Sequence, residues 1–211
     1  MYVVARDYGF APNPFHGYCT LAACKPVIRR KAEVGDWIIG MGGSALKATG
    51  RCIFSMKVTE KLTFNEYWLN PKFLDKKPVR NGSRKMLVGD NIYYLDPTSK
   101  KWNQEDSHHS KPDGSINSEN LKKDTGTTDK VLISEHFFYF GKEAPMVPAH
   151  FLNAIGYKNR RNHLVFDEVA AGNIIQWLEN TFSKSLNQIT GAPFNFESSE
   201  KRYSGVNSKV I

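Results

Sequence analysis

GDWIIGMGGSALKATGRCIFSMKVT, residues 35–59, is the stretch that decides the expected fold. Residues 37–41 form a short apolar run, and residues 51–59 alternate apolar and polar side chains with the two-residue period of a β-strand. One face of the second segment collects its apolar side chains: Cys52, Phe54, Met56 and Val58. We therefore expect two strands joined by a short Gly-rich connection.

The connection contains a pattern known from dinucleotide-binding folds. Residues 40–45, GMGGSA, match G-x-G-x-x-A, in which the N-terminus of a following helix receives the pyrophosphate. The next strand starts within six residues, which leaves no room for that helix, so a Rossmann site is not expected. Gly42 and Gly43 are kept as candidate nucleotide-binding residues, because glycine lets a ligand approach the backbone closely.

The flanking segments indicate an α+β protein. Strands are expected at residues 2–6, 92–95, 130–134 and 136–140, and helices at residues 26–32, 62–70 and 167–184. Thr63 and Glu66 have the spacing of a capping box. Because regular βαβ alternation is lacking, we expect a curved or barrel-like mixed β-sheet with two or three flanking helices. Residues 1–150 form the expected domain, and residues 151–211 add a C-terminal helix and a strapping tail to the same compact unit.

Composition and charge limit the classes of function. The chain has 211 residues, 40% of them hydrophobic and 24% charged, which excludes collagen and coiled coils and fits one domain. Its apolar runs are too short for a membrane helix, and the N-terminus does not resemble a secretory signal, so we expect a cytoplasmic protein without a membrane partner. A net charge of +8 favours a polyanionic partner, DNA or a nucleotide. The sequence identifies no cofactor and no protein partner.

A long polar segment, residues 96–129, contains candidate acid–base chemistry. Histidine can exchange a proton near neutral pH, and a carboxylate can orient it. We therefore select His109 as a catalytic acid or base and Asp124 as the group that orients it. The alternative is that His108, His109 and Ser110 belong to a solvated polar loop.

The three cysteines are not expected to form a metal site. His16, Cys19 and Cys24 lie close in the sequence, and Cys52 is a conceivable fourth zinc ligand. The C-x4-C spacing is loose, however, and cysteine is commonly buried as a small apolar residue. The chain also lacks the G-x-S-x-G, H-E-x-x-H and Cys–His protease signatures.

The segment DYGFAPNPFHG, residues 7–17, provides the second part of the expected site. Its glycines and prolines indicate a loop with a defined path, and its aromatic residues indicate a loop that packs on the body. Asp7, at the end of the first strand, and His16 are the catalytic candidates here. The alternative for Asp7 is a turn-capping residue.

Basic and aromatic residues supply candidate contacts to a nucleotide. Basic side chains can bind phosphate, and aromatic rings can stack on a base. The nucleotide-binding candidates, with Gly42 and Gly43, are Arg6, Tyr8, Phe10, Asn13, Lys25, Arg29, Arg30 and Trp37. The alternative for the basic residues is a solvated face above the core.

Several motifs together resemble one family. They are residues 7–17, C-K-P-x-I-R at 24–29, GDW at 35–37, K-V-T-E at 57–60, GDN at 89–91, the His109-Ser110 loop, Asp124-Thr125 and FFYFG at 137–141. Over roughly residues 1–150 the chain resembles nucleotide modification associated domain 2, a family associated with hypermodification of DNA bases. A weaker, fold-level likeness is to PUA-like barrels, including EVE-type domains, which bind a nucleobase in an aromatic pocket. The family resemblance implies a theme, and it carries over no catalytic set.

Three functional hypotheses follow. The first is an enzyme that performs group transfer or hydrolysis on a base or nucleotide in DNA, in base hypermodification or in phage–host conflict. Asp7 and His16 would then face His109 and Asp124 across an extruded base. The second is a non-catalytic reader of modified DNA bases. The third is an NAD-dependent transferase, for which the sequence offers only the loosely placed Arg6, His16 and Glu135.

Overall fold

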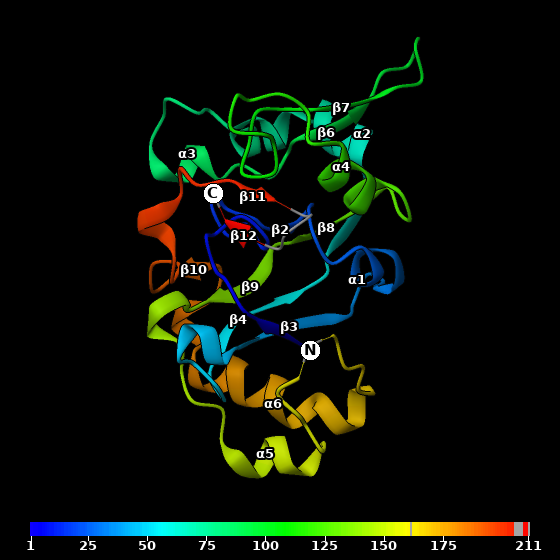
Figure 1. Cartoon of the computed structure of the whole chain (residues 1–211). Helices are drawn as coiled ribbons and strands as arrows, with labels where there is room; N and C mark the ends of the chain where they lie inside the picture. Colours follow the sequence, from blue (N-terminus) through cyan, green and yellow to red (C-terminus); the bar gives the residue numbers. More distant parts are fainter. Residues whose placement is uncertain (161, 205–208, 211) are drawn as a thin grey trace.

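A mixed five-stranded sheet forms the centre of the protein. The computed structural model describes residues 1–160, 162–204 and 209–210 (Figure 1). The sheet has the order β1-β3-β4-β9-β10, and its strands are β1 (Tyr2–Val4), β3 (Trp37–Gly42), β4 (Cys52–Lys57), β9 (His136–Tyr139) and β10 (Gln188–Ile189). The pairs β1/β3 and β9/β10 are parallel, whereas β3/β4 and β4/β9 are antiparallel. The expected strand pair of residues 35–59 is thus the middle of this sheet.

A second, antiparallel sheet continues from the first. Its order is β2-β8-β5, with β2 (Cys19–Leu21), β8 (Lys130–Ser134) and β5 (Glu60–Thr63). The chain passes from β4 into β5 across two residues and from β8 into β9 across Glu135, so two strand pairs run from one sheet into the other. The described strands close no barrel, because β1 and β10 are edges that pair with one neighbour each. The α+β class is observed, and the barrel-like, PUA-like form is not.

The central strand β4 is buried on both faces, which the sequence pattern did not predict. Ser55, expected on the polar face, is fully buried. Gly40 on β3 explains how the aromatic Phe54 fits, because a Cβ atom at Gly40 would lie 2.1 Å from Phe54 Cε1. A core strand of this kind therefore tolerates both small polar and large apolar residues.

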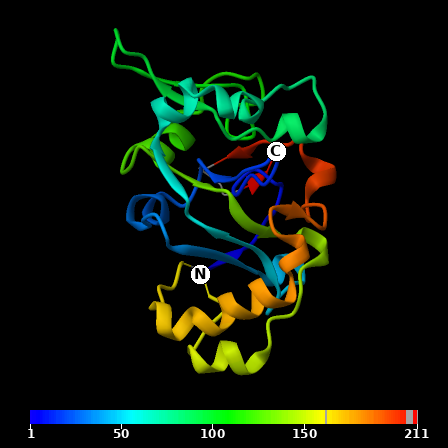
Figure 2. The ribbon, with the colours of Figure 1, turned by 180° about the vertical axis from the view of Figure 1, so that it is seen from behind.

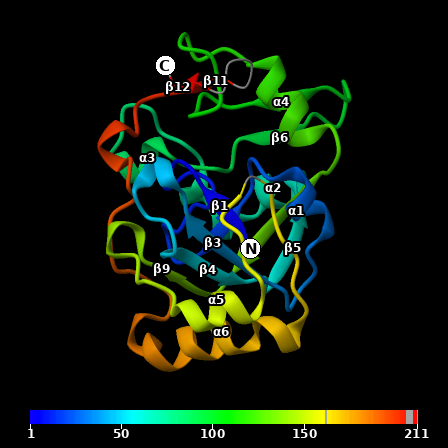
Figure 3. The same cartoon turned by 60° about the horizontal axis from the view of Figure 1, so that its bottom comes forward.

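The expected helices form where their caps lie. The structure contains α1 (Pro26–Lys31), with Pro26 in its first turn, and α2 (Phe64–Leu69), whose capping box is made by Thr63 and Glu66. Asp167 caps α6 (Glu168–Thr181) through a hydrogen bond to Ala170 N. With α5 (Ala149–Ala154), α6 lies below the central sheet in Figures 1 and 2, and Figure 3 shows both helices running beneath it.

Residues 96–129, expected as a long polar loop, are largely built into the body. β6 (Tyr93–Leu95) pairs with β7 (Trp102–Gln104), and α4 (Ser118–Thr125) follows. Buried polar side chains replace the missing apolar pattern: Ser107, His108, His109, Ser110, Asn120 and Asp124. The described residues also contain α3 (Arg84–Leu87), β11 (Tyr203–Ser204) and β12 (Lys209–Val210). Their short 3₁₀ helices are η1 (Ser44–Leu46), η2 (Pro71–Lys76), η3 (Gly141–Glu143), η4 (Ser183–Ser185) and η5 (Phe196–Ser198). In the part of the chain that is described, no helix has the length and apolar character to cross a bilayer.

Candidate functional site

Cys24 lies on a strained turn between a strand and a helix. The turn joins β2 to α1, and Cys24 and Lys25 both adopt left-handed backbone angles, with φ of 59° and 42°. For residues other than glycine this conformation costs about 1–2 kcal/mol each, and such strain is concentrated at functional sites. Arg29 Nε donates to the Cys24 carbonyl at 2.8 Å, and the Cys24 amide donates to Asp124 Oδ1 at 2.9 Å. These contacts hold the backbone of Cys24 in place.

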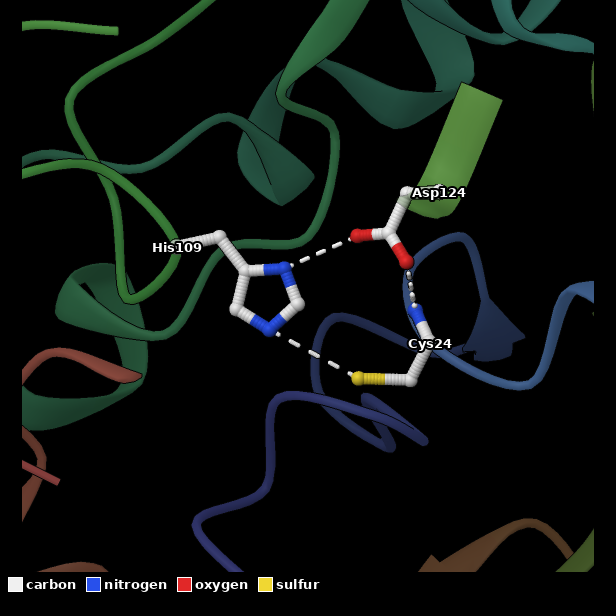
Figure 4. A group of neighbouring side chains, drawn as sticks. All are labelled: Cys24, His109 and Asp124. Carbon is white, nitrogen blue, oxygen red and sulfur yellow. Dashed lines mark hydrogen bonds and ion pairs between the residues drawn. The ribbon is translucent and has the colours of Figure 1, made fainter. Parts of the chain in front are cut away.

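His109 stands between Cys24 and Asp124. Its Nε2 lies 3.6 Å from Cys24 Sγ, and its Nδ1 lies 2.8 Å from Asp124 Oδ2 (Figure 4). Gln104 and Asn120 side chains both donate to the His109 carbonyl, at 3.0 and 2.8 Å, which fixes the backbone. Because an ionised carboxylate only accepts hydrogen bonds, Nδ1 carries a proton and Nε2 faces the sulfur.

Asp124 is fully buried and well supplied with donors. Besides His109 and the Cys24 amide, the Tyr93 hydroxyl donates to Oδ2 at 2.9 Å. Burial by itself would raise the pKa of Asp124, but His109 and Arg29 outweigh it and lower the pKa. Burial by itself would likewise lower the pKa of His109, and Cys24 and Asp124 together raise it to about 10. His109 is therefore a protonated, positively charged group whose Nε2 lies 3.6 Å from the Cys24 sulfur.

The three residue types could also hold a metal ion, because one ligand atom from each lies within 4.8 Å of the others. A metal would need one sulfur, one ring nitrogen and one carboxylate oxygen to face a common point. Here the sulfur and the carboxylate contact opposite nitrogens of the ring (Figure 4). The three residues form a closed group, in which Asp124 also accepts from the Cys24 amide, and their contacts suit a nucleophile, a base and an orienting carboxylate.

A pocket of about 360 Å³ opens beside Cys24, His109 and Asp124, which we call the triad. It is lined by Cys24, His108 and His109, by Arg6, Lys25 and Lys123, and by the aromatic residues Tyr2, Tyr8, Phe10 and Tyr203, among others. Lys123 Nζ lies 5.6 Å from the centre of the Tyr203 ring, and Arg6 Cζ lies 5.8 Å from it. Besides its histidines, the described lining contains three basic side chains, from lysine and arginine, and no carboxylate.

Several residues selected from the sequence meet at this place. Phe10, from residues 7–17, packs its ring 4.7 Å from the ring of His109, so the two distant segments do come together. The selected residues found in the pocket or in the triad are Arg6, Tyr8, Phe10, Lys25, His109 and Asp124.

Asp7 and His16 do not line the pocket. Asp7 is buried, and its carboxylate accepts hydrogen bonds from the Tyr139 hydroxyl and from the amides of Phe194 and Gly9. Burial raises the pKa of Asp7. The residue anchors the C-terminal segment, because the Asp7 backbone also pairs with Asn195. His16 is exposed at a loop position with φ of 60°.

Arg29 and Asn13 are corrected from ligand contacts to internal supports. Arg29 is fully buried, and its guanidinium donates to three backbone carbonyls, those of Cys24, Lys130 and Asp124. Because its side chain is fully buried, Arg29 is not exposed to a phosphate, and it instead holds the backbone of Cys24 and Asp124 in place. Asn13 is also fully buried: its amide donates to Val88 O, and its Oδ1 accepts from Lys76 Nζ and the Phe15 amide.

The glycine pair does not offer amides to a ligand. The Gly42 and Gly43 amides donate to Arg51 O and Val4 O at 2.8 and 2.9 Å. A Cβ atom at Gly42 would lie 2.2 Å from the Ala48 carbonyl oxygen, so close packing explains the glycine.

Trp37 and Arg30 are also absent from the pocket lining. Trp37 instead lines a second hollow of about 910 Å³ beside α6 and packs edge-on against His136, with ring centres 5.4 Å apart. Arg30 is exposed on α1. Of the three groups offered for NAD chemistry, Arg6 lines the pocket, whereas His16 and Glu135 do not.

Sequence reasoning did not select Cys24 as a site residue. Cys24 was expected to be a buried apolar residue, and its only signal was its position just before a proline-initiated helix. His108, Lys123 and Tyr203 were also missed, because Tyr203 and Lys123 come from segments that look like polar surface. Their place in the pocket depends on long-range folding.

One comparison with known proteins identifies a family. A family model described as nucleotide modification associated domain 2 matches residues 1–200. The match extends past the 150 residues over which the motifs were recognised. No curated protein and no solved structure matches the chain.

Proposed function

Because the chain belongs to the nucleotide modification associated domain 2 family, we propose that it is a cysteine-dependent enzyme acting on a nucleotide or on a base in DNA. The supporting observation is that His109 contacts Cys24 Sγ through one ring nitrogen and Asp124 through the other, beside a pocket. Cys24 is the nucleophile, His109 the acid and base, and Asp124 the group that orients His109. The family gives the theme, nucleotide modification, and the triad gives the chemistry.

The reaction proceeds through a covalent sulfur adduct. The reacting form is the pair in which the Cys24 proton already lies on His109 Nε2, and its thiolate attacks an electrophilic carbon and forms an S–C bond. The leaving group departs with the proton from Nε2. Water, or the hydroxyl or amine of an acceptor, then loses its proton to Nε2 and attacks the same carbon. The S–C bond breaks, and the proton returns to sulfur, so the step is a hydrolysis or a group transfer.

The pocket chemistry supports a nucleotide as one substrate. Its volume of about 360 Å³ falls in the usual range for small-molecule sites, about 300–1,000 Å³. Arg6, Lys25 and Lys123 bring positive charge to the pocket lining, which suits the phosphate of a nucleotide. Tyr8 and Phe10 offer rings on which a base can stack.

Mass spectrometry of nucleosides tests the proposal. Deoxynucleoside monophosphates and DNA with modified bases are incubated with the protein, with Cys24→Ala and with His109→Ala. We expect both variants to lose product formation and to retain binding within a few fold. Cys19→Ala is the matched control, since Cys19 is a fully buried thiol outside the pocket. Full turnover by Cys24→Ala would refute the proposal.

A reader of modified bases is the second candidate, favoured by the aromatic lining. A reader would form no product with any substrate, and its preference for modified DNA would depend on Tyr8 and Phe10. Alanine at either position would then cost about 1–3 kcal/mol per stacked base. A metal-dependent reaction is separated by dialysis against a chelator, which leaves a thiol mechanism active.

A further inference from the structure

His108 lies beside the triad and has no part in the proposed reaction. The residue is 4% exposed and lines the pocket. Its ring packs against those of Tyr8 and Phe10, with ring centres 4.7 and 5.2 Å apart, and lies 5.9 Å from the ring of His109. Buried polar atoms normally form hydrogen bonds, so the partner of each ring nitrogen of His108 bears on its role.

The contacts of His108 fix where its proton lies. Nδ1 is 2.6 Å from the Lys201 carbonyl oxygen, and a carbonyl can only accept, so Nδ1 is the protonated nitrogen. The Tyr203 amide donates to the His108 carbonyl at 2.7 Å, which holds the same segment from its other side. Nε2 then carries a lone pair, and among the residues described it has no hydrogen-bond partner.

The surroundings also keep this ring neutral. Burial lowers the pKa of His108 to about 3, and the positive charges of His109, Arg80 and Arg202 act in the same direction. The neighbouring histidines therefore differ in charge, because His109 faces a carboxylate and His108 faces a carbonyl. A neutral imidazole with a fixed proton is an acceptor at Nε2 and cannot donate there.

We infer that His108 selects the ligand: its Nε2 accepts a hydrogen bond from an N–H or O–H group on the base of the bound nucleotide. This inference rests on the proposed nucleotide function. A base that offers only an acceptor at that point would leave two lone pairs facing each other, with neither satisfied. The substrate class is therefore a nucleotide whose base carries a donor on the edge that faces His108.

Matched nucleotide pairs test the inference by equilibrium binding. Each of dCMP, dAMP, dTMP and dGMP is compared with an analogue in which an edge N–H donor is removed or methylated. For the wild-type protein we expect at least one pair in which the analogue binds about 10- to 100-fold more weakly. His108→Phe keeps the ring packing and should bind both members of that pair within a few fold of each other. His150→Phe, which removes an exposed histidine of α5, is the control and should discriminate like wild type.

The outcomes distinguish a failure of the proposed role of His108 from a failure of the proposed nucleotide function. Binding without discrimination in wild type, or equal discrimination in His108→Phe, overturns the role of His108 and leaves the proposed function standing. Failure of all four nucleotides to bind overturns nucleotide recognition, and the inference with it. If His108→Phe does not fold, ¹⁵N spectra of wild type decide: the His108 Nε2 signal should move with the donor nucleotide and stay in place with its analogue.

Discussion

Asp124→Asn is the sharpest perturbation of the proposed triad. The substitution keeps the shape of the side chain and removes its charge. In the folded protein Oδ1 accepts from the Cys24 amide, and Oδ2 accepts from His109 and from the Tyr93 hydroxyl. An asparagine must place its NH₂ group opposite one of these donor sets. If it faces His109, Nδ1 becomes the acceptor, and the proton moves to Nε2, where it blocks acceptance of the Cys24 proton.

The expected size of the effect of Asp124→Asn follows from the pKa of His109. Raising the pKa from 6.5 to about 10 corresponds to about 5 kcal/mol, at 1.36 kcal/mol per unit, and Cys24 and Asp124 supply it together. In the variant the pKa of His109 falls toward or below 6.5, because burial remains and the carboxylate charge is gone. Turnover should fall by about three to four orders of magnitude, as expected when a histidine base is left in the wrong tautomer.

Two measurements read this change. The ring signals of His109 in NMR spectra should stay those of a protonated histidine through pH 8 in wild type, and not in Asp124→Asn. Iodoacetamide labels Cys24 selectively, because Cys19 and Cys52 are fully buried and burial raises their pKa values. Labelling of Cys24 at pH 7 should be slower in the variant.

The pH dependence of protein stability provides an independent test of the raised His109 pKa. A raised folded-state pKa stabilises the protein fully below pH 6.5, and this stabilisation is lost as the pH rises through about 10. The stability advantage of wild type over Asp124→Asn should therefore shrink from pH 6.5 upward. The comparison cancels the contributions of the N-terminal amine and of Lys76, whose pKa values burial lowers to about 6 and about 8.

The control is Tyr93→Phe, which removes a donor to the same carboxylate oxygen without changing charge. It should cost about 1 kcal/mol of stability and leave His109 protonated at pH 8. The reasoning is refuted if Asp124→Asn keeps a protonated His109 at pH 8 and labels Cys24 at the wild-type rate.

Three further changes test other parts of the structure. Gly40→Ala should lower the unfolding free energy by about 1–3 kcal/mol in urea titrations, because its Cβ would lie 2.1 Å from Phe54; an unchanged midpoint would contradict the packing. Asp7→Asn should cost about 1–3 kcal/mol of stability while iodoacetamide labelling of Cys24 stays at the wild-type rate, and slower labelling would return Asp7 to the site. Lys123→Ala should weaken nucleotide binding more at low salt than at high salt, since screening reduces the contribution of this exposed charge, and a salt-independent effect would exclude a phosphate contact.

Local features of the fold could be predicted from sequence because their causes are local. The capping box of Thr63 and Glu66, Pro26 at the start of its helix and Asp167 at the cap of α6 act within one turn of backbone. The two strands within residues 35–59 could likewise be predicted, from the apolar run, from the two-residue alternation of apolar and polar side chains, and from the Gly-rich connection between them. Sequence could not predict whether the sheet closes into a barrel. That depends on whether the edge strands β1 and β10 find a second neighbour, and here each pairs with one strand only.

The site divides in the same way. Sequence reasoning selected His109 and Asp124, because histidine near a carboxylate is a recognisable chemical pair, and it selected the loop of Phe10 as a neighbour. It assigned Arg29 to phosphate, since a basic residue in a helix looks exposed until the carbonyls of three segments surround it. It could not find Cys24 as a nucleophile, because its partners lie 85 and 100 residues further along the chain.

What the sequence determined by itself is therefore a basic α+β chain with a nucleotide-related family signature, and a histidine and a carboxylate that the fold brings into contact. The tertiary structure alone decided that the pair continues to a sulfur. It also decided that Lys123 and Tyr203 join Arg6 around one pocket. The physical reason is that helix caps and strand periods are set by neighbours in sequence, whereas a nucleophile, its base and its pocket are set by distances across the fold.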